Sequence, residues 1–137
     1  KFKKKIIYPI HPRTLSKLNG KKLPKGIITV KPLGFIDFCK LEKSALCVIT
    51  DSGTVPEECL YFRKPSVSIR ESTERPEYIE AGASILSGLK PEDILESTNL
   101  IMSHNSDWEW NISLGDGKTA SKVVNILRGK NRKILEI

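Results

Sequence analysis

The groups in this sequence best suited to chemistry are hydroxyl, amide and cationic groups that could hold a phosphate. Ser52, Gly53 and Thr54 follow an apolar run at 45–49 and precede helix-forming residues. A helix N-terminus has unpaired N–H groups and the positive end of the helix dipole, so a strand–glycine–helix turn can bind phosphate. A well-capped turn with no ligand is the alternative, and it is common in α/β proteins.

The start of the helix after this turn has its own signals. Thr54 and Glu57 have the spacing of a capping box, and Pro56 falls in the first turn, where its missing N–H costs little. If Glu57 is engaged in the cap, Glu58 is the remaining carboxylate. Glu58 could accept the two hydroxyls of a ribose, or it could be a surface glutamate.

A second polar segment, residues 70–77, follows the apolar run 66–69. Arg75 has a planar, permanently charged fork that matches phosphate oxygens. The alternative is a salt bridge to one of the nearby acids, Glu71, Glu74 or Glu77.

His11 and Phe38 are further candidates. His11 could donate to a phosphate, or it could cap the following helix. Phe38 could flank a base, although a single aromatic residue on a helix is more often part of a core. The spacing of the acidic residues identifies no catalytic acid and base pair.

The predicted strands and helices determine where these candidate residues lie. Short apolar runs predict strands at 6–10, 26–30, 45–49, 66–69 and 84–86, and the segments between and after them predict helices at 14–18, 36–43, 55–62, 76–81 and 90–103. A last helix carries an apolar stripe, and 105–116 reads as irregular. The alternation predicts an α/β fold, a doubly wound parallel sheet with helices on both faces.

In such sheets, ligands bind beyond the carboxyl ends of the strands. His11, residues 32–34, Ser52-Gly53-Thr54 and residues 73–75 each follow a predicted strand directly. We therefore expect these loops to meet at one edge of the sheet, which favours the anion site over the empty turn.

Composition sets the broad class. The 137 residues, 39% hydrophobic and 28% charged, predict a single soluble domain, 1–137. Three cysteines without metal spacing indicate a reducing cytoplasm. No membrane span or signal peptide is apparent, and the missing initiator Met suggests that the chain begins inside a longer protein. The net charge of +7 is concentrated near the termini, which favours solvated ends over a nucleic-acid face.

The ordered motifs resemble one family. Asp51-Ser52-Gly53 with Glu57-Glu58, Lys64-Pro65 and Thr73-Glu74-Arg75-Pro76-Glu77 are similar to those of the non-hydrolysing UDP-N-acetylglucosamine 2-epimerases, over residues 8–88. The resemblance implies the Rossmann-like C-terminal half of a GT-B fold. It implies that the N-terminal domain is absent from this chain, and it implies no cofactor or metal.

The resemblance also implies roles for individual residues. His11, taken as catalytic, and Arg75 would lie at the nucleotide phosphates. Ser52, Gly53 and Thr54 would bind the diphosphate, Glu58 the ribose, and Leu33 and Phe38 the uracil. The family eliminates UDP as the proton on carbon 2 of the sugar leaves, and then adds UDP back to the 2-acetamidoglycal. The proton-transfer acids would lie on the absent domain.

Some positions depart from the commonest family pattern. Thr54 and Pro56 differ within the first motif, Pro12 follows His11, and Leu33 replaces a glutamine. These variants resemble the branch that forms UDP-N-acetyl-L-fucosamine from its L-talo epimer for surface polysaccharide. The identity of the sugar is thus less constrained than that of the nucleotide.

Two other functions stay open. The chain could be the nucleotide-sugar half of a GT-B glycosyltransferase, or a basic nucleic-acid-binding domain. The Thr73–Glu77 stretch favours the epimerase. The partners expected are a UDP-sugar, the absent domain and, as is common in the family, a second copy in a homodimer; no nucleic acid or membrane is expected.

Overall fold

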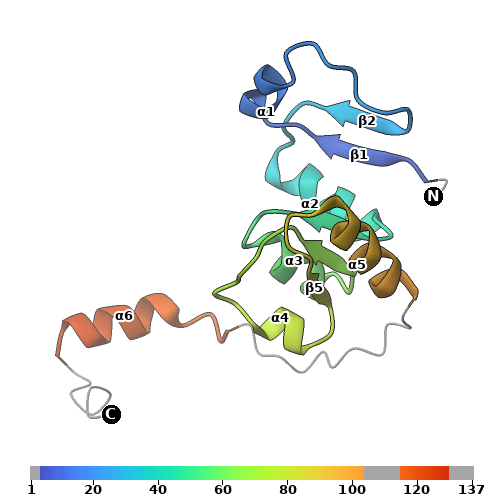
Figure 1. Cartoon of the computed structure of the whole chain (residues 1–137). Helices are drawn as coiled ribbons and strands as arrows, with labels where there is room; N and C mark the ends of the chain where they lie inside the picture. The colour runs from blue at the N-terminus through green and yellow to red at the C-terminus, as the bar shows by residue number, and fades with distance from the viewer. Residues whose placement is uncertain (1–3, 104–114, 130–137) are drawn as a thin grey trace. The chain divides into compact units, whose positions relative to one another are not determined.

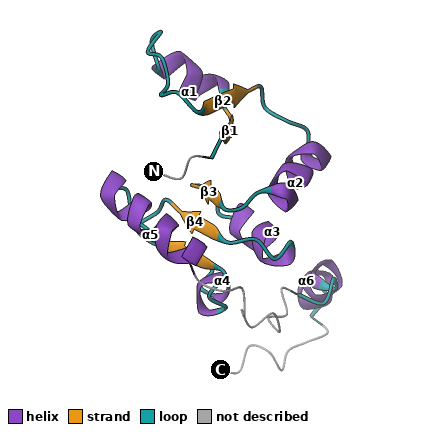
Figure 2. Ribbon diagram, turned by 90° about the vertical axis from the view of Figure 1, so that its right-hand side faces the viewer, coloured by secondary structure: helices purple, strands orange, loops and turns teal. Residues whose placement is uncertain are grey.

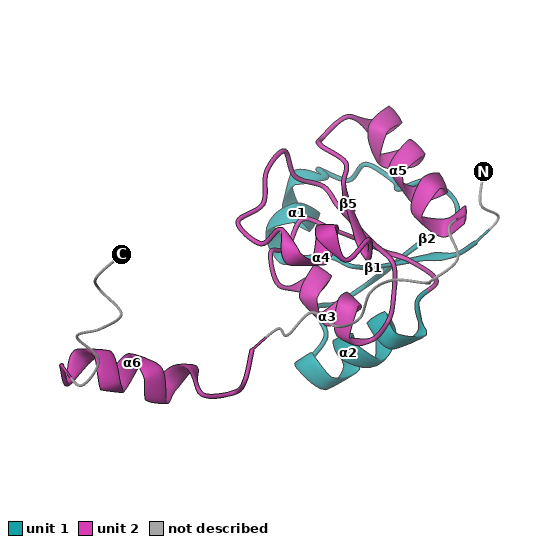
Figure 3. Cartoon of the chain, turned by 90° about the horizontal axis from the view of Figure 1, so that it is seen from below, with its two compact units in different colours: residues 1–45 teal, residues 46–137 magenta. Residues whose placement is uncertain are grey.

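The computed structural model describes residues 4–103 and 115–129. The chain separates into two compact units, residues 1–45 and 46–137, which are distinguished by colour in Figure 3. Residues 1–45 are unit 1, and residues 46–137 are unit 2.

Unit 1 is a β-α-β-α segment (Figure 1). It contains β1 (Ile6–Pro9), α1 (Pro12–Lys17), β2 (Ile27–Val30) and α2 (Phe35–Ser44). The two strands pair in parallel, with Ile6 opposite Ile27 and Pro9 opposite Val30. The carboxyl ends of β1 and β2 therefore lie at one edge, as expected for a crossover through a helix.

The helix α1 begins two residues earlier than predicted. His11 has extended backbone angles, and its Nδ1 accepts a hydrogen bond from the backbone N–H of Arg13 at 3.2 Å. Pro12 occupies the first turn, where proline is already shaped for a helix. The start of α1 is thus set by a histidine cap, which is the alternative role considered for His11.

Unit 2 holds a three-stranded parallel sheet with its helices. Its elements are β3 (Val48–Thr50), α3 (Val55–Tyr61), β4 (Ser66–Ser68), α4 (Glu77–Glu80), β5 (Ser84–Leu86), α5 (Pro91–Ser103) and α6 (Thr119–Leu127). The strand order is β3-β4-β5. In Figure 2, α5 and α3 lie on opposite sides of β4, and α5 contacts β4 and β5 while α3 contacts β4. Helices therefore pack on both faces of this sheet, as predicted.

The core of unit 2 explains why β4 is central. All three of its residues are buried, and the side chains of Leu60, Tyr78, Ala81 and Ala83 form a cluster. A strand covered on both faces has no solvent side, so Ser66 and Ser68 are buried together with Val67, although the strand alternates polar and apolar residues. At the end of α4, Gly82 has φ 74°, the left-handed conformation predicted for it.

The predicted boundaries differ most at β3. The apolar run was assigned to 45–49, whereas the strand spans Val48–Thr50, because pairing with β4 begins at Val48 opposite Ser66. The five strands of the described residues form two parallel sheets, one in each unit. The predicted irregular stretch 105–116 lies almost wholly outside the described residues. In the described part of the chain, no helix has both the length and the apolar character that a membrane crossing requires.

Candidate strand-end anion site

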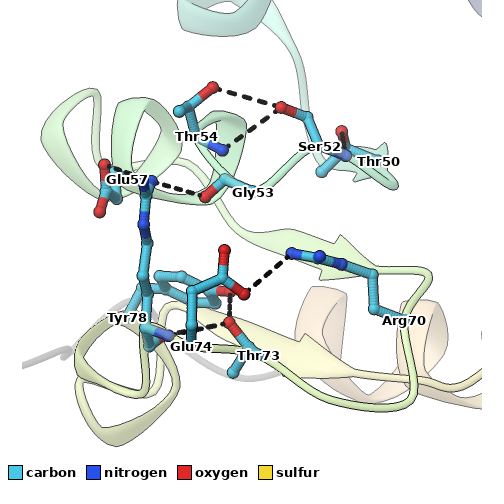
Figure 4. Close-up of polar contacts among 10 residues, drawn as sticks. Thr50, Ser52, Gly53, Thr54, Glu57, Arg70, Thr73, Glu74 and Tyr78 are labelled. Atoms are coloured by element: carbon cyan, nitrogen blue, oxygen red, sulfur yellow. Dashed lines mark hydrogen bonds and ion pairs between the residues drawn. The ribbon is translucent and has the colours of Figure 1, made fainter.

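The turn after β3 is held by its own hydroxyl groups (Figure 4). The N–H of Ser52 donates to Thr50 Oγ1 at 3.0 Å, and the N–H of Thr54 donates to Ser52 Oγ at 3.3 Å. The hydroxyls of Ser52 and Thr54 lie 3.2 Å apart. These short-range bonds give the turn a defined shape directly before α3.

The predicted capping box is not formed. Thr54 is the residue before α3, but its side chain makes no cap hydrogen bond, and its backbone angles of −98° and −32° are helical. A capping residue normally has an extended backbone that turns its side chain back toward the helix. The hydroxyl of Thr54 lies against Ser52 instead, and Glu57 is left for another partner.

That partner is Arg75. Its Nη1 lies 3.1 Å from Glu57 Oε2 and donates to the carbonyl oxygen of Gly53 at 3.0 Å. The two charged side chains are each 36% exposed. The alternative considered for Arg75 was a bridge to an acid of its own segment, whereas its ion pair is with Glu57 of α3, and Arg75 lies at the 52–54 turn.

A second ion pair lies on the other side of Gly53. Arg70 Nη1 is 3.5 Å from Glu74 Oε2. A Cβ atom on Gly53 would lie 3.3 Å from both of these side chains, which is closer than ordinary packing. The backbone N–H of Glu74 and, secondarily, the charge of Arg70 hold the pKa of the Glu74 carboxyl below its usual value.

The segment that carries Arg75 is tied to the core. The hydroxyls of Thr73 and Tyr78 are hydrogen-bonded, and Tyr78 is 1% exposed. The N–H of Arg75 donates to Thr73 Oγ1 at 3.2 Å. Because Tyr78 cannot move without disrupting the cluster, these bonds limit where the backbone of Arg75 can go.

Glu58 is part-buried in the first turn of α3, beside Glu57. Its backbone N–H donates to the carbonyl of Thr54 at 3.2 Å. Of the four loops that were predicted to meet, the 52–54 turn and the segment of Arg75 lie together in unit 2. Glu58 belongs to the helix that follows this turn.

The other predicted site residues belong to unit 1. His11 follows β1 and Leu33 follows β2, so they come from the carboxyl ends of paired strands. His11 is exposed and caps α1, which is the structural role considered for it. Leu33 is 39% exposed, and Phe38 is part-buried in α2.

Sequence reasoning missed two members of this cluster, Glu57 and Arg70. Glu57 was assigned to the cap, and Arg70 was not singled out. The available signal was the high density of charged residues in 70–77, because two arginines among several acids are expected to form ion pairs in the folded chain. No local pattern shows which acid that partner is.

Parallel α/β proteins bind ligands beyond the carboxyl ends of their strands, and the charged cluster of unit 2 occupies such a place. A family model described as UDP-N-acetylglucosamine 2-epimerase matches residues 1–128. The chain belongs to this family.

Individual relatives agree with the family match. A UDP-N-acetylglucosamine 2-epimerase from Methanococcus maripaludis is 41% identical, in an alignment that covers 96% of this chain and 37% of that protein. A UDP-2,3-diacetamido-2,3-dideoxy-D-glucuronate 2-epimerase from Pseudomonas aeruginosa is 29% identical, covering 89% of this chain and 34% of that protein. The chain thus spans little more than a third of the length of these relatives.

A solved structure also superposes on the chain. The UDP-GlcNAc 2-epimerase of Methanocaldococcus jannaschii, crystallised with UDP-GlcNAc and UDP, matches with a TM-score of 0.77 and 35% identity over 91% of this chain and 36% of that one. The predicted class, a Rossmann-like α/β fold of the GT-B type, is confirmed.

Proposed function

We propose that this chain is the nucleotide-binding half of a UDP-N-acetylhexosamine 2-epimerase that serves surface polysaccharide synthesis. The family match over residues 1–128 carries the proposal. It is supported by the position of Arg75, whose guanidinium contacts the carbonyl of Gly53 in the turn after β3.

The turn and Arg75 bind the diphosphate in this proposal. Ser52 and Thr54 offer hydroxyl groups, Gly53 offers its backbone N–H, and Arg75 offers a fixed positive charge. Glu58, in the first turn of α3, accepts the ribose hydroxyls. The nearby acids Glu57 and Glu74 are each paired with an arginine, so their charges are partly neutralised.

Unit 1 supplies the remaining contacts in this proposal. Leu33 and Phe38 line the uracil, and His11 contacts the phosphates as the catalytic residue of this half. Because Nδ1 of His11 accepts the N–H of Arg13, the proton of a neutral ring is on Nε2, which is then a donor on an exposed side chain. A donor of this kind suits a phosphate oxygen.

The proposed epimerisation has two steps, elimination of UDP and its re-addition. The proton on carbon 2 of the sugar leaves as the bond from the anomeric carbon to the UDP oxygen breaks, giving a 2-acetamidoglycal and UDP. UDP then adds back to the anomeric carbon while carbon 2 is reprotonated on the opposite face. The cationic and N–H groups of this chain stabilise the charge that develops on departing UDP. The proton transfer belongs to the other domain.

The sugar is proposed as UDP-GlcNAc interconverting with UDP-ManNAc. The 6-deoxy L-talo to L-fuco pair is a second candidate, favoured by the Thr54 and Pro56 variants. We further propose that residues 1–137 act as one UDP-binding domain of a cytoplasmic enzyme. Its partners are the N-terminal domain of the longer protein and a second copy of that protein.

Titration of the chain with UDP and with uridine tests the nucleotide role. We expect UDP to bind weakly and more tightly than uridine, and we expect the chain alone to turn over no substrate. Measurable epimerisation by the 137-residue chain would contradict the assignment of proton transfer to the other domain. An equal affinity for UDP and uridine would contradict the diphosphate site.

Incubation of the longer protein with a UDP-sugar alone separates the enzyme classes. Formation of the carbon-2 epimer without an acceptor supports the epimerase, whereas sugar transfer only when an acceptor is added indicates the glycosyltransferase. Salt-sensitive retention of DNA or RNA that UDP leaves unchanged would indicate a nucleic-acid-binding domain instead.

A further inference from the structure

We infer that Glu57 is a positioning residue that holds the guanidinium of Arg75 ready for the diphosphate. The inference rests on the proposed function. It starts from a contact that no local pattern predicted, the ion pair between Arg75 Nη1 and Glu57 Oε2 at 3.1 Å.

Both contacts of Arg75 use the same nitrogen. Nη1 carries two hydrogens, and it lies 3.1 Å from the Glu57 carboxylate and 3.0 Å from the Gly53 carbonyl oxygen. A guanidinium has five N–H donors in a rigid plane, so three donors remain, on Nε and Nη2. Among the described residues these three have no partner. They form the side edge of the fork, which can bind two oxygens of one phosphate.

The backbone that carries the Glu57 side chain is in a defined place. The N–H of Glu57 donates to the carbonyl of Thr54 at 3.0 Å, inside the first turn of α3. A free arginine side chain loses considerable rotamer freedom when it binds a ligand. An arginine already held by a carboxylate and a carbonyl has lost most of that freedom beforehand, so binding costs less.

Glu57 also has an opposite effect on UDP affinity. A carboxylate beside Arg75 also cancels part of the positive charge that attracts an anion. The two effects have opposite signs on UDP affinity when the carboxylate is removed. Because Glu57 engages only Nη1 and leaves the Nε–Nη2 edge open, we infer that positioning outweighs cancellation.

The test is a titration of the full chain, wild type and Glu57→Gln, with UDP and with uridine. Glu80→Gln is the matched control, since it removes the same charge from an exposed glutamate of α4. We expect Glu57→Gln to weaken UDP binding about fivefold, as for one part-exposed ion pair, and to leave uridine binding unchanged. Glu80→Gln should change neither.

A double variant shows whether Glu57 acts through Arg75. In an Arg75→Ala background, Glu57→Gln should no longer weaken UDP binding. Equal or tighter UDP binding by Glu57→Gln, or its full effect without Arg75, would overturn the inference. A wild-type chain that does not distinguish UDP from uridine would instead overturn the proposed function.

A spectroscopic measurement needs neither UDP nor a stable variant. The Nη1 group of Arg75 in the free wild-type chain should rotate slowly about its bond to the central carbon, because it donates to the Gly53 carbonyl and is ion-paired with the Glu57 carboxylate. Nitrogen-detected NMR of the arginine side chains measures this rotation, with the exposed Arg128 as an internal reference. Equally fast rotation for both arginines would overturn the inference.

Discussion

Replacement of Arg75 by alanine is the most informative single perturbation of the strand-end cluster. The change removes one permanent charge and both contacts of Nη1, with the Glu57 carboxylate and with the Gly53 carbonyl. It leaves the backbone of the segment in place, because the Arg75 N–H is bonded to Thr73 and Thr73 is bonded to Tyr78. Fold and binding can therefore be measured separately.

The structural cost of Arg75→Ala should be small. The lost ion pair is about one-third exposed on each side, and water can replace the lost partner of Gly53, so the free energy of unfolding should fall by about 1 kcal/mol. The binding cost should be larger. A hydrogen bond to a charged group contributes about 1.5–3 kcal/mol, which is roughly 10- to 100-fold in the dissociation constant for UDP.

The measurement is a pair of titrations, with UDP and with uridine, on the wild type and on Arg75→Ala. Uridine lacks the diphosphate, so its affinity should change by less than about twofold if Arg75 contacts only phosphate. Arg128→Ala is the control, because it removes the same charge from an exposed residue at the end of α6. Equal losses of UDP and uridine binding would refute the reasoning and assign Arg75 a structural role.

Three further outcomes are expected. Gly53→Ala should weaken UDP binding yet change unfolding by less than about 0.5 kcal/mol, because its Cβ would meet only the movable ends of side chains such as Arg70; a large loss of stability would contradict this. Thr73→Val should lower the free energy of unfolding in urea by about 1–3 kcal/mol, since the buried Tyr78 hydroxyl loses its partner; an unchanged free energy would contradict it. Burial raises the pKa of the Cys47 thiol from 9.0 to about 11, so its contribution to stability should be complete below pH 9 and decline as the pH rises toward 11. Urea unfolding of wild type and Cys47→Ala at pH 8 and pH 10 checks this, and an identical pH dependence would refute it.

Much of the fold could be predicted because its signals are local. The strand β5 spans Ser84–Leu86 as predicted, and Gly82 has the left-handed backbone expected at the end of α4. Apolar runs, glycines and prolines act within a few residues, and they are read directly from the sequence. The order of loops after parallel strands then predicted that Arg75 would lie near the 52–54 turn.

The same local signals failed where a distant group competed. Thr54 and Glu57 have the spacing of a capping box, yet Glu57 pairs with Arg75 from another loop. The choice between a charged partner and a helix N–H depends on what tertiary packing brings within reach. His11 shows the reverse case, since its cap on α1 is local and was foreseen only as an alternative.

By itself, then, the amino-acid sequence determined the class of fold, the order of the elements and the family to which the chain belongs. These follow from short-range patterns and from motifs that are written along the chain. Only the tertiary structure decided which carboxylate holds Arg75 and which edge of its guanidinium stays open. Such pairings join residues from separate loops, so they exist only after the parallel strands have brought the ends of those loops together.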